Sequence, residues 1–161
     1  STVTRALQIA HDTGVKTILN PAPGQPLDPL VLSMVDVLTP NQTEAEIISG
    51  QTISSLGDAE EAAKALLARG VETVVLTLGA DGALIVTADI TQHVPGERVE
   101  VVDTTGAGDA FNGALAVALA EGQSLPEAVA FANAAAALQV TKVGTAPAMP
   151  YRREVEALLR E

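Results

Sequence analysis

The sequence predicts an α/β fold, with a three-layer, doubly wound and mostly parallel sheet covered by helices on both faces. Short aliphatic runs alternate with longer helical patterns along the chain, and this alternation is typical of parallel sheets. Hydrophobic residues make up 47% of the 161 residues, but aromatic residues only 2%. The core must therefore consist of Ala, Val, Leu and Ile, which pack closely between layers. We expect one domain over residues 1–161.

Composition and charge exclude several classes of function. The chain contains no cysteine and carries a formal net charge of -11 at pH 7. Thiol redox chemistry and thiolate metal sites are therefore excluded. Nucleic acid and anionic membranes are disfavoured as partners, because both attract clustered Lys and Arg. No apolar run is long enough to cross a bilayer, and we expect a cytoplasmic protein.

Helical and strand patterns alternate through the first half of the chain. Residues 2–13 have an apolar helical face, and Gly14 follows them as a stop signal. The elements expected next are a strand over 16–19, a helix over 27–34, a strand over 35–38, and helices that open at Asn41 and Asp58, each with Glu in the capping-box position.

The second half is expected to continue this alternation. Residues 71–78 and 83–86 are apolar runs on either side of a glycine-containing turn, which predicts a hairpin. The Ala-rich helix that begins at Ser124 is expected to pack against the helix that follows Asp109. The other elements expected are a strand over 99–102, the helix from Asp109 to Gly122, and a final helix over 152–161.

The stretch around Gly106–Gly108 carries the strongest functional signal. Its small residues let the backbone approach a ligand closely, and a helix begins directly after them. Unpaired amides and the positive end of a helix dipole form an anion site, for which phosphate is the expected guest. Asp109 is then either a helix N-cap or a base that takes the proton of an attacking hydroxyl in phosphoryl transfer.

Several other residues have a purely structural interpretation beside a functional one. Asn41 with Glu44 forms a capping box, and Asn133 reads as a solvent-facing residue in an alanine run. His11 and His93 are expected at the surface, since no cluster with metal-ligand spacing surrounds them. A dinucleotide-dependent oxidoreductase fits poorly, because Phe111 stands where the last glycine of its fingerprint is required.

The string Asp103-Thr-Thr-Gly-Ala-Gly-Asp-Ala-Phe-Asn-Gly113 closely resembles the C-terminal signature of the ribokinase family of sugar kinases. The resemblance covers nearly the whole chain, beginning with the Asn-Pro-Ala-Pro of residues 20–23. It implies that Asp109 is the catalytic base that deprotonates a sugar hydroxyl. It also implies that the backbone of Gly106, Ala107 and Gly108 forms an anion hole for the transferred phosphate.

The same resemblance implies an ATP site with magnesium. Asn41 would contact the nucleotide, and Glu44 would help to place the hydrated Mg²⁺. The further nucleotide-contacting positions implied by the family pattern are Thr77, Leu78, Gly79, Ala80, Asp81, Gly82, Gly108 and Asn133. These roles are compatible with the structural ones, because a capping box or a turn can also face a ligand.

The resemblance further implies a monovalent cation, usually potassium, beside the anion hole. Backbone oxygens would supply most of its ligands. The positions that would surround the ion are Asp103, Thr105, Gln139, Lys142, Gly144 and Ala148.

Family members are about twice as long as this chain, and their N-terminal half carries most sugar contacts and a small β lid. We therefore expect a C-terminal portion that works with a missing N-terminal half or another chain, or as a homo-oligomer, because an uncovered sheet edge invites pairing. The expected activity is ATP-dependent phosphorylation of a sugar, ribose in the first instance. The alternative is a nucleotide-binding fragment without transfer activity of its own.

Overall fold

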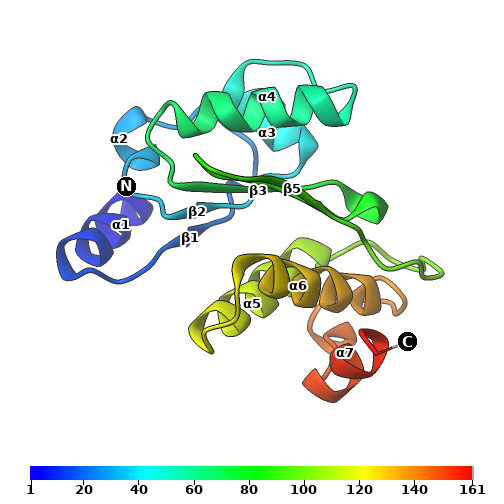
Figure 1. Ribbon diagram of the computed structural model, residues 1–161. Helices are drawn as coiled ribbons and strands as arrows, with labels where there is room; N and C mark the ends of the chain where they lie inside the picture. Colours follow the sequence, from blue (N-terminus) through cyan, green and yellow to red (C-terminus); the bar gives the residue numbers. More distant parts are fainter. Residues whose placement is uncertain (161) are drawn as a thin grey trace. The chain divides into compact units, whose positions relative to one another are not determined.

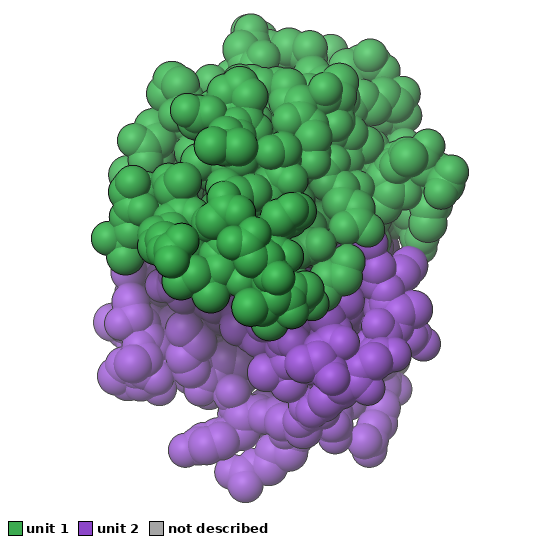
Figure 2. Space-filling view, turned by 90° about the vertical axis from the view of Figure 1, so that its left-hand side faces the viewer, with its two compact units in different colours: residues 1–78, 84–93 green, residues 79–83, 94–161 purple. Residues whose placement is uncertain are grey.

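The computed structural model describes residues 1–160 and confirms the α/β class (Figure 1). The chain divides into two compact units, coloured separately in Figure 2. Unit 1 comprises residues 1–78 and 84–93, and unit 2 comprises residues 79–83 and the chain from Val94 onward. None of the helices in residues 1–160 is long and apolar enough to cross a membrane.

Unit 1 is built on a sheet of five strands in sequential order. Its first three strands are parallel, with Ile18 opposite Val37 and Val37 opposite Thr73. The elements of this part of the chain are α1 (Thr2–Thr13), β1 (Ile18–Leu19), α2 (Pro29–Leu32), β2 (Val37–Leu38), α3 (Gln42–Ser49), α4 (Leu56–Leu67), β3 (Thr73–Thr77), β4 (Ala83–Val86) and β5 (Thr91–Val94).

The core of unit 1 lies between the central strands and helices α3 and α4, which share one face of the sheet (Figure 1). Val74 and Leu76 of β3 point into this core, together with Leu66 of α4. Val75 and Ile85, at alternate strand positions, are buried as well. The centre of the sheet is therefore apolar on both faces, as the continuous Val and Leu run predicts.

Unit 2 is organised around two long helices that lie side by side, α5 (Ala107–Ala120) and α6 (Leu125–Gln139), with α7 (Arg152–Leu158) against α6 (Figure 1). Unit 2 also contains the short 3₁₀ turns η1 (Gly79–Asp81) and η2 (Ala146–Ala148). Ala128, Ala132 and Ala135 of α6 are buried. Small side chains permit this close approach, and the predicted packing of α6 against the helix after Asp109 is confirmed.

Two strand predictions and one helix cap need correction. The segment 99–102 forms no strand. Val101 and Val102 are each 56% exposed, and the N–H groups of Val102 and Asp103 donate to Val140 O at the end of α6 instead of to a strand. Residues 91–94, where the sequence predicts His93 at the surface and no strand, form β5. Helix α4 is capped by Ser55 and not by Asp58, whose N–H donates to the Ser55 hydroxyl.

The predicted hairpin between β3 and β4 agrees with the structure. The two strands are neighbours in the sheet and are joined by residues 78–82 alone. A parallel crossover needs about a dozen residues or more, so the connection is a hairpin whose turn is the η1 segment.

Candidate active site

Asn41 and Glu44 form the predicted capping box at the start of α3. The Glu44 N–H donates to Asn41 Oδ1 at 2.8 Å, and the Asn41 N–H donates to Glu44 Oε2 at 2.9 Å. Glu44 is buried, and Gly24 packs against it: a Cβ placed on Gly24 would lie 3.3 Å from Glu44 Cγ and 2.9 Å from Ile47 Cδ1. This pairing fixes both side chains before any ligand is present.

Asn41 and Thr77 are brought together at the carboxyl ends of neighbouring parallel strands. A parallel β-bridge joins the two residues, and the Thr77 N–H donates to Pro40 O at 2.9 Å. In open α/β sheets, ligands bind beyond the carboxyl ends of the strands. Two of the positions assigned to nucleotide therefore share the edge of unit 1 at which a ligand is expected.

The turn that follows β3, residues 79–82, is held by a close backbone crossing within unit 2. Gly82 has φ +91, and a Cβ placed there would lie 2.2 Å from Val94 O. A Cβ on Gly96 would similarly lie 2.6 Å from Ala80 O. Glycine is needed at this crossing because any side chain would collide with main-chain atoms that cannot rotate away.

Asn133 supports the same crossing from α6. Its Nδ2 donates to Val94 O at 3.1 Å and to Pro95 O at 3.2 Å. The side chain is buried, so the expectation of a solvent-facing Asn is wrong. The segment 94–96, which sequence reasoning passed over, thus links Asn133 to the turn at Gly82. Its Pro-Gly pair was the available signal.

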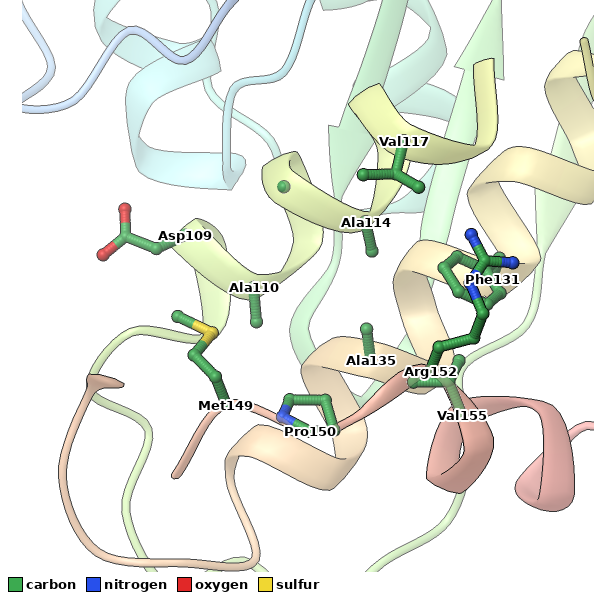
Figure 3. Close-up of a pocket in the computed structure, with 11 residues that line it drawn as sticks. Asp109, Ala110, Ala114, Val117, Phe131, Ala135, Met149, Pro150, Arg152 and Val155 are labelled. Atoms are coloured by element: carbon green, nitrogen blue, oxygen red, sulfur yellow. The ribbon is translucent and has the colours of Figure 1, made fainter. Parts of the chain in front are cut away.

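Helix α5 begins at the glycine loop, and Gly106 is its N-cap, with φ +84. Asp109 lies in the first turn and does not cap the helix, so the N-cap interpretation of Asp109 is wrong. Its carboxylate is exposed. Asp109 also lines a cavity of about 330 Å³, whose wall is otherwise largely apolar and includes Ala110, Ala114, Phe131 and Met149. In Figure 3 the Asp109 carboxylate is directed away from these other lining residues.

The first-turn amides of α5 have no acceptors inside the helix. The Ala107 N–H donates to Thr104 O at 3.3 Å, while Gly108 and Asp109 are exposed at this end. A Cβ on Gly108 would meet nothing within 4 Å. An anion can therefore approach the backbone here, and the helix dipole favours it.

Asp103 holds the loop before α5 to the loop after α6. Its Oδ2 accepts from the Gly144 N–H at 3.0 Å, and its Oδ1 accepts from the Thr105 N–H at 2.9 Å. Hydrogen bonds from Gly144 and then Thr105 lower the pKa of Asp103 from 3.8 to about 2. The carboxylate is thus ionised at neutral pH, and its oxygens are already occupied as acceptors.

The remaining positions assigned to potassium gather in the same part of unit 2. Gln139 Nε2 donates to Thr105 O, Gly144 O and Thr145 O. Lys142 pairs through Nζ with Glu154 Oε1 at 3.3 Å, and Ala148 is buried in η2. The carbonyls of Thr105 and Gly144 therefore already have a donor from this chain, which does not fit a cation at the same point.

Residues 1–160 contain no group of three or more His, Asp or Glu side chains arranged to hold a metal ion. Magnesium does not require such a cage, since it keeps several waters and binds through one or two carboxylates together with substrate phosphates. Glu44 and the phosphates of a nucleotide fit that mode of binding.

Unit 1 carries a pair of polar residues at the carboxyl ends of neighbouring strands, and unit 2 carries a glycine turn and a helix N-terminus with an exposed carboxylate in its first turn. Each is a feature at which an α/β protein can bind phosphate. Comparison with known proteins is more specific. The family model described as pfkB family carbohydrate kinase matches residues 1–152, and the chain belongs to this family.

Individual relatives agree with this assignment. The chain is 45% identical over 154 residues to a ribokinase of Haemophilus influenzae, an alignment that covers 96% of the chain and 50% of the relative. The structure of Arabidopsis thaliana ribokinase complexed with ribose and ATP matches with a TM-score of 0.92 and 34% identity, over 99% of this chain and 52% of that one. A putative ribokinase II of E. coli in complex with ATP and Mg²⁺ matches with a TM-score of 0.84 and 28% identity, over 99% and 53% of the two chains. The chain thus spans about half the length of the relatives it matches.

Proposed function

We propose that this chain supplies the nucleotide site and the catalytic base of an ATP-dependent sugar kinase that acts on ribose. The observation that carries the proposal is the position of Asp109. Its carboxylate is exposed in the first turn of α5, beside open amides, and has no capping role that would account for it. A carboxylate is unfavourable for phosphate binding alone, whereas a base next to an anion hole is what phosphoryl transfer requires.

In the proposed reaction the oxygen of a sugar hydroxyl forms a bond to the γ-phosphorus of ATP, and Asp109 takes the proton of that hydroxyl. The bond from that phosphorus to the bridging oxygen breaks, and ADP leaves with the electron pair. The N–H groups at Gly108 and Asp109 stabilise the negative charge on the moving phosphoryl group, assisted by the dipole of α5. Gly106 lets the chain turn into the helix at this point.

The nucleotide is assigned to the residues at the carboxyl ends of β2 and β3 and to the turn that follows β3. Asn41 and Thr77 are joined by a β-bridge. The turn at 79–82 crosses segment 94–96 closely at Gly82, and Asn133 donates to Val94 O and Pro95 O of that segment. Magnesium, when bound, neutralises charge on the phosphates, and Glu44 is the residue assigned to orient its water shell. Leu78, Ala80 and Asp81 are assigned to the nucleotide by the family pattern alone.

Ribose is proposed as the sugar because the Arabidopsis relative is described as complexed with ribose and ATP. The rest of the sugar pocket is assigned to the half of the relatives that this chain does not match. Strand β1 is one of the two edges of the sheet, and Val3, Ile9 and Val15, which precede it in the chain, are about half exposed. We propose that another strand covers this edge, either from the same protein or from a second copy.

The proposal is tested by measuring ADP release by the complete protein with ribose, 2-deoxyribose and fructose 6-phosphate. Ribose-dependent ADP release with Mg²⁺ is the expected result. ATP binding without turnover on any sugar would favour the alternative, a nucleotide-binding protein without transfer activity. Turnover on another sugar but not on ribose would retain the kinase and reject the substrate.

A further inference from the structure

The side chain of Gln139 lies at the centre of a group of backbone carbonyl oxygens. Its Nε2 is 2.8 Å from Gly144 O and 3.2 Å from both Thr105 O and Thr145 O. The residue is fully buried, with 0% exposure. Three carbonyl dipoles therefore converge on one point in the interior of unit 2, and this chain places a side-chain amide there.

The orientation of that amide follows from its surroundings. If its nitrogen and oxygen were exchanged, Oε1 would face the three carbonyl oxygens and repel them. In the orientation observed, Oε1 is buried and has no hydrogen-bond partner among residues 1–160. The hydrogen bonds from Nε2 to the three carbonyl oxygens are therefore made while Oε1 of the same amide stays buried without a hydrogen bond.

The segments that meet at Gln139 are also joined without it. Asp103 accepts N–H bonds from Thr105 and Gly144, which bridges the loop before α5 and the loop after α6. A Cβ on Gly106 would lie 3.2 Å from Gln139 Nε2. The start of α5 is therefore packed directly on the amide, and a cation could not occupy the position of Nε2 while the side chain remains there.

Converging carbonyl oxygens are the typical ligands of a desolvated monovalent cation. We infer that Gln139 takes the place of the potassium ion expected from the family resemblance, so that the loop before α5 is ordered by a neutral side-chain donor instead of an ion. The protein is accordingly independent of monovalent cations at this site. Gln139 would act in this way whether or not the proposed kinase activity is found, because the contacts belong to the fold.

The test is thermal unfolding of the complete protein in potassium chloride and in choline chloride at equal ionic strength. The wild type should have the same Tm in both salts. Gln139→Ala removes the amide and leaves three carbonyls free to bind an ion, so its Tm should be higher in potassium by about 2 °C or more. Gln51→Ala, an exposed position, is the control and should show no difference between the salts.

A potassium-dependent rise in the Tm of the wild type would overturn the inference. Equal Tm values for Gln139→Ala in the two salts would also overturn it, because the emptied carbonyl group would then have no affinity for the ion. If Gln139→Ala does not fold, hydrogen exchange of the wild type at residues 103–106 decides the question. The inference requires equal protection in both salts, and greater protection in potassium rejects it.

Discussion

Replacement of Gly82 by alanine should destabilise the protein through a collision of main-chain atoms. The φ of +91 at this residue is unfavourable for alanine, at a cost of about 1–2 kcal/mol. The added Cβ would also lie 2.2 Å from Val94 O, 2.4 Å from Gly96 N and 2.6 Å from Pro95 C. All three are backbone atoms, so relief requires a shift of segment 94–96, which overpacking data place at about 1–3 kcal/mol.

Urea unfolding of the complete protein measures this cost, and Gly79→Ala is the matched control. Gly79 also has a positive φ, +61, but its Cβ would meet nothing within 4 Å. We expect a loss of about 2–5 kcal/mol for Gly82→Ala and about 1–2 kcal/mol for Gly79→Ala. Equal losses for the two variants would refute the close crossing as the reason for glycine at position 82.

Three further predictions concern single side chains. The pKa of Asp103 is lowered from 3.8 to about 2, so its ionised form adds stability that is complete above about pH 4 and is lost as the pH falls through 2. Urea titrations at several pH values should show that Asp103→Asn loses this acid dependence, and the same pH dependence in the variant and the wild type would contradict the role given to Asp103. Asn133→Ala leaves Val94 O and Pro95 O without their donor and should cost about 1–3 kcal/mol of unfolding free energy, a prediction that fails if the urea midpoint does not move. Asn41→Ala should lower the free energy of unfolding by about 1 kcal/mol as a lost cap and also raise the KM for ATP, whereas Ser55→Ala, which removes a similar cap from α4, should lower stability alone. The same KM for ATP in both variants would argue against a nucleotide role for Asn41.

The elements that sequence reasoning found were those whose local pattern agrees with their packing. The strand at 83–86 was predicted with its observed ends, and the capping box of Asn41 and Glu44 is present in full. Apolar periodicity and cap residues act within a few positions of each other, so the sequence alone displays them. The resemblance to the ribokinase family could likewise be recognised from the sequence, because the residues of the signature are contiguous, from Asp103 to Gly113.

The misses depend on partners far away in the chain. Val101 and Val102 have strand propensity, but their segment is attached to Val140 at the end of α6, and no local signal indicates that. Asn133 resembled a surface residue because its acceptors, Val94 O and Pro95 O, are distant in sequence. The family resemblance assigned positions around Gln139 to a cation. It carried no information on the Gln139 side chain, whose Nε2 donates to Gly144 O itself.

The most direct test of the kinase assignment compares turnover with nucleotide affinity in the complete protein carrying Asp109→Asn. The carboxylate is exposed and caps no helix, so the fold and the ATP affinity measured by calorimetry should remain close to those of the wild type. The rate of ribose phosphorylation should fall by about 10²-fold or more, the contribution typical of a positioned general base. Asp89→Asn, an exposed residue in the turn before β5, should change neither quantity. Undiminished phosphorylation by Asp109→Asn, with ATP affinity intact, would contradict the assignment of Asp109 as the base.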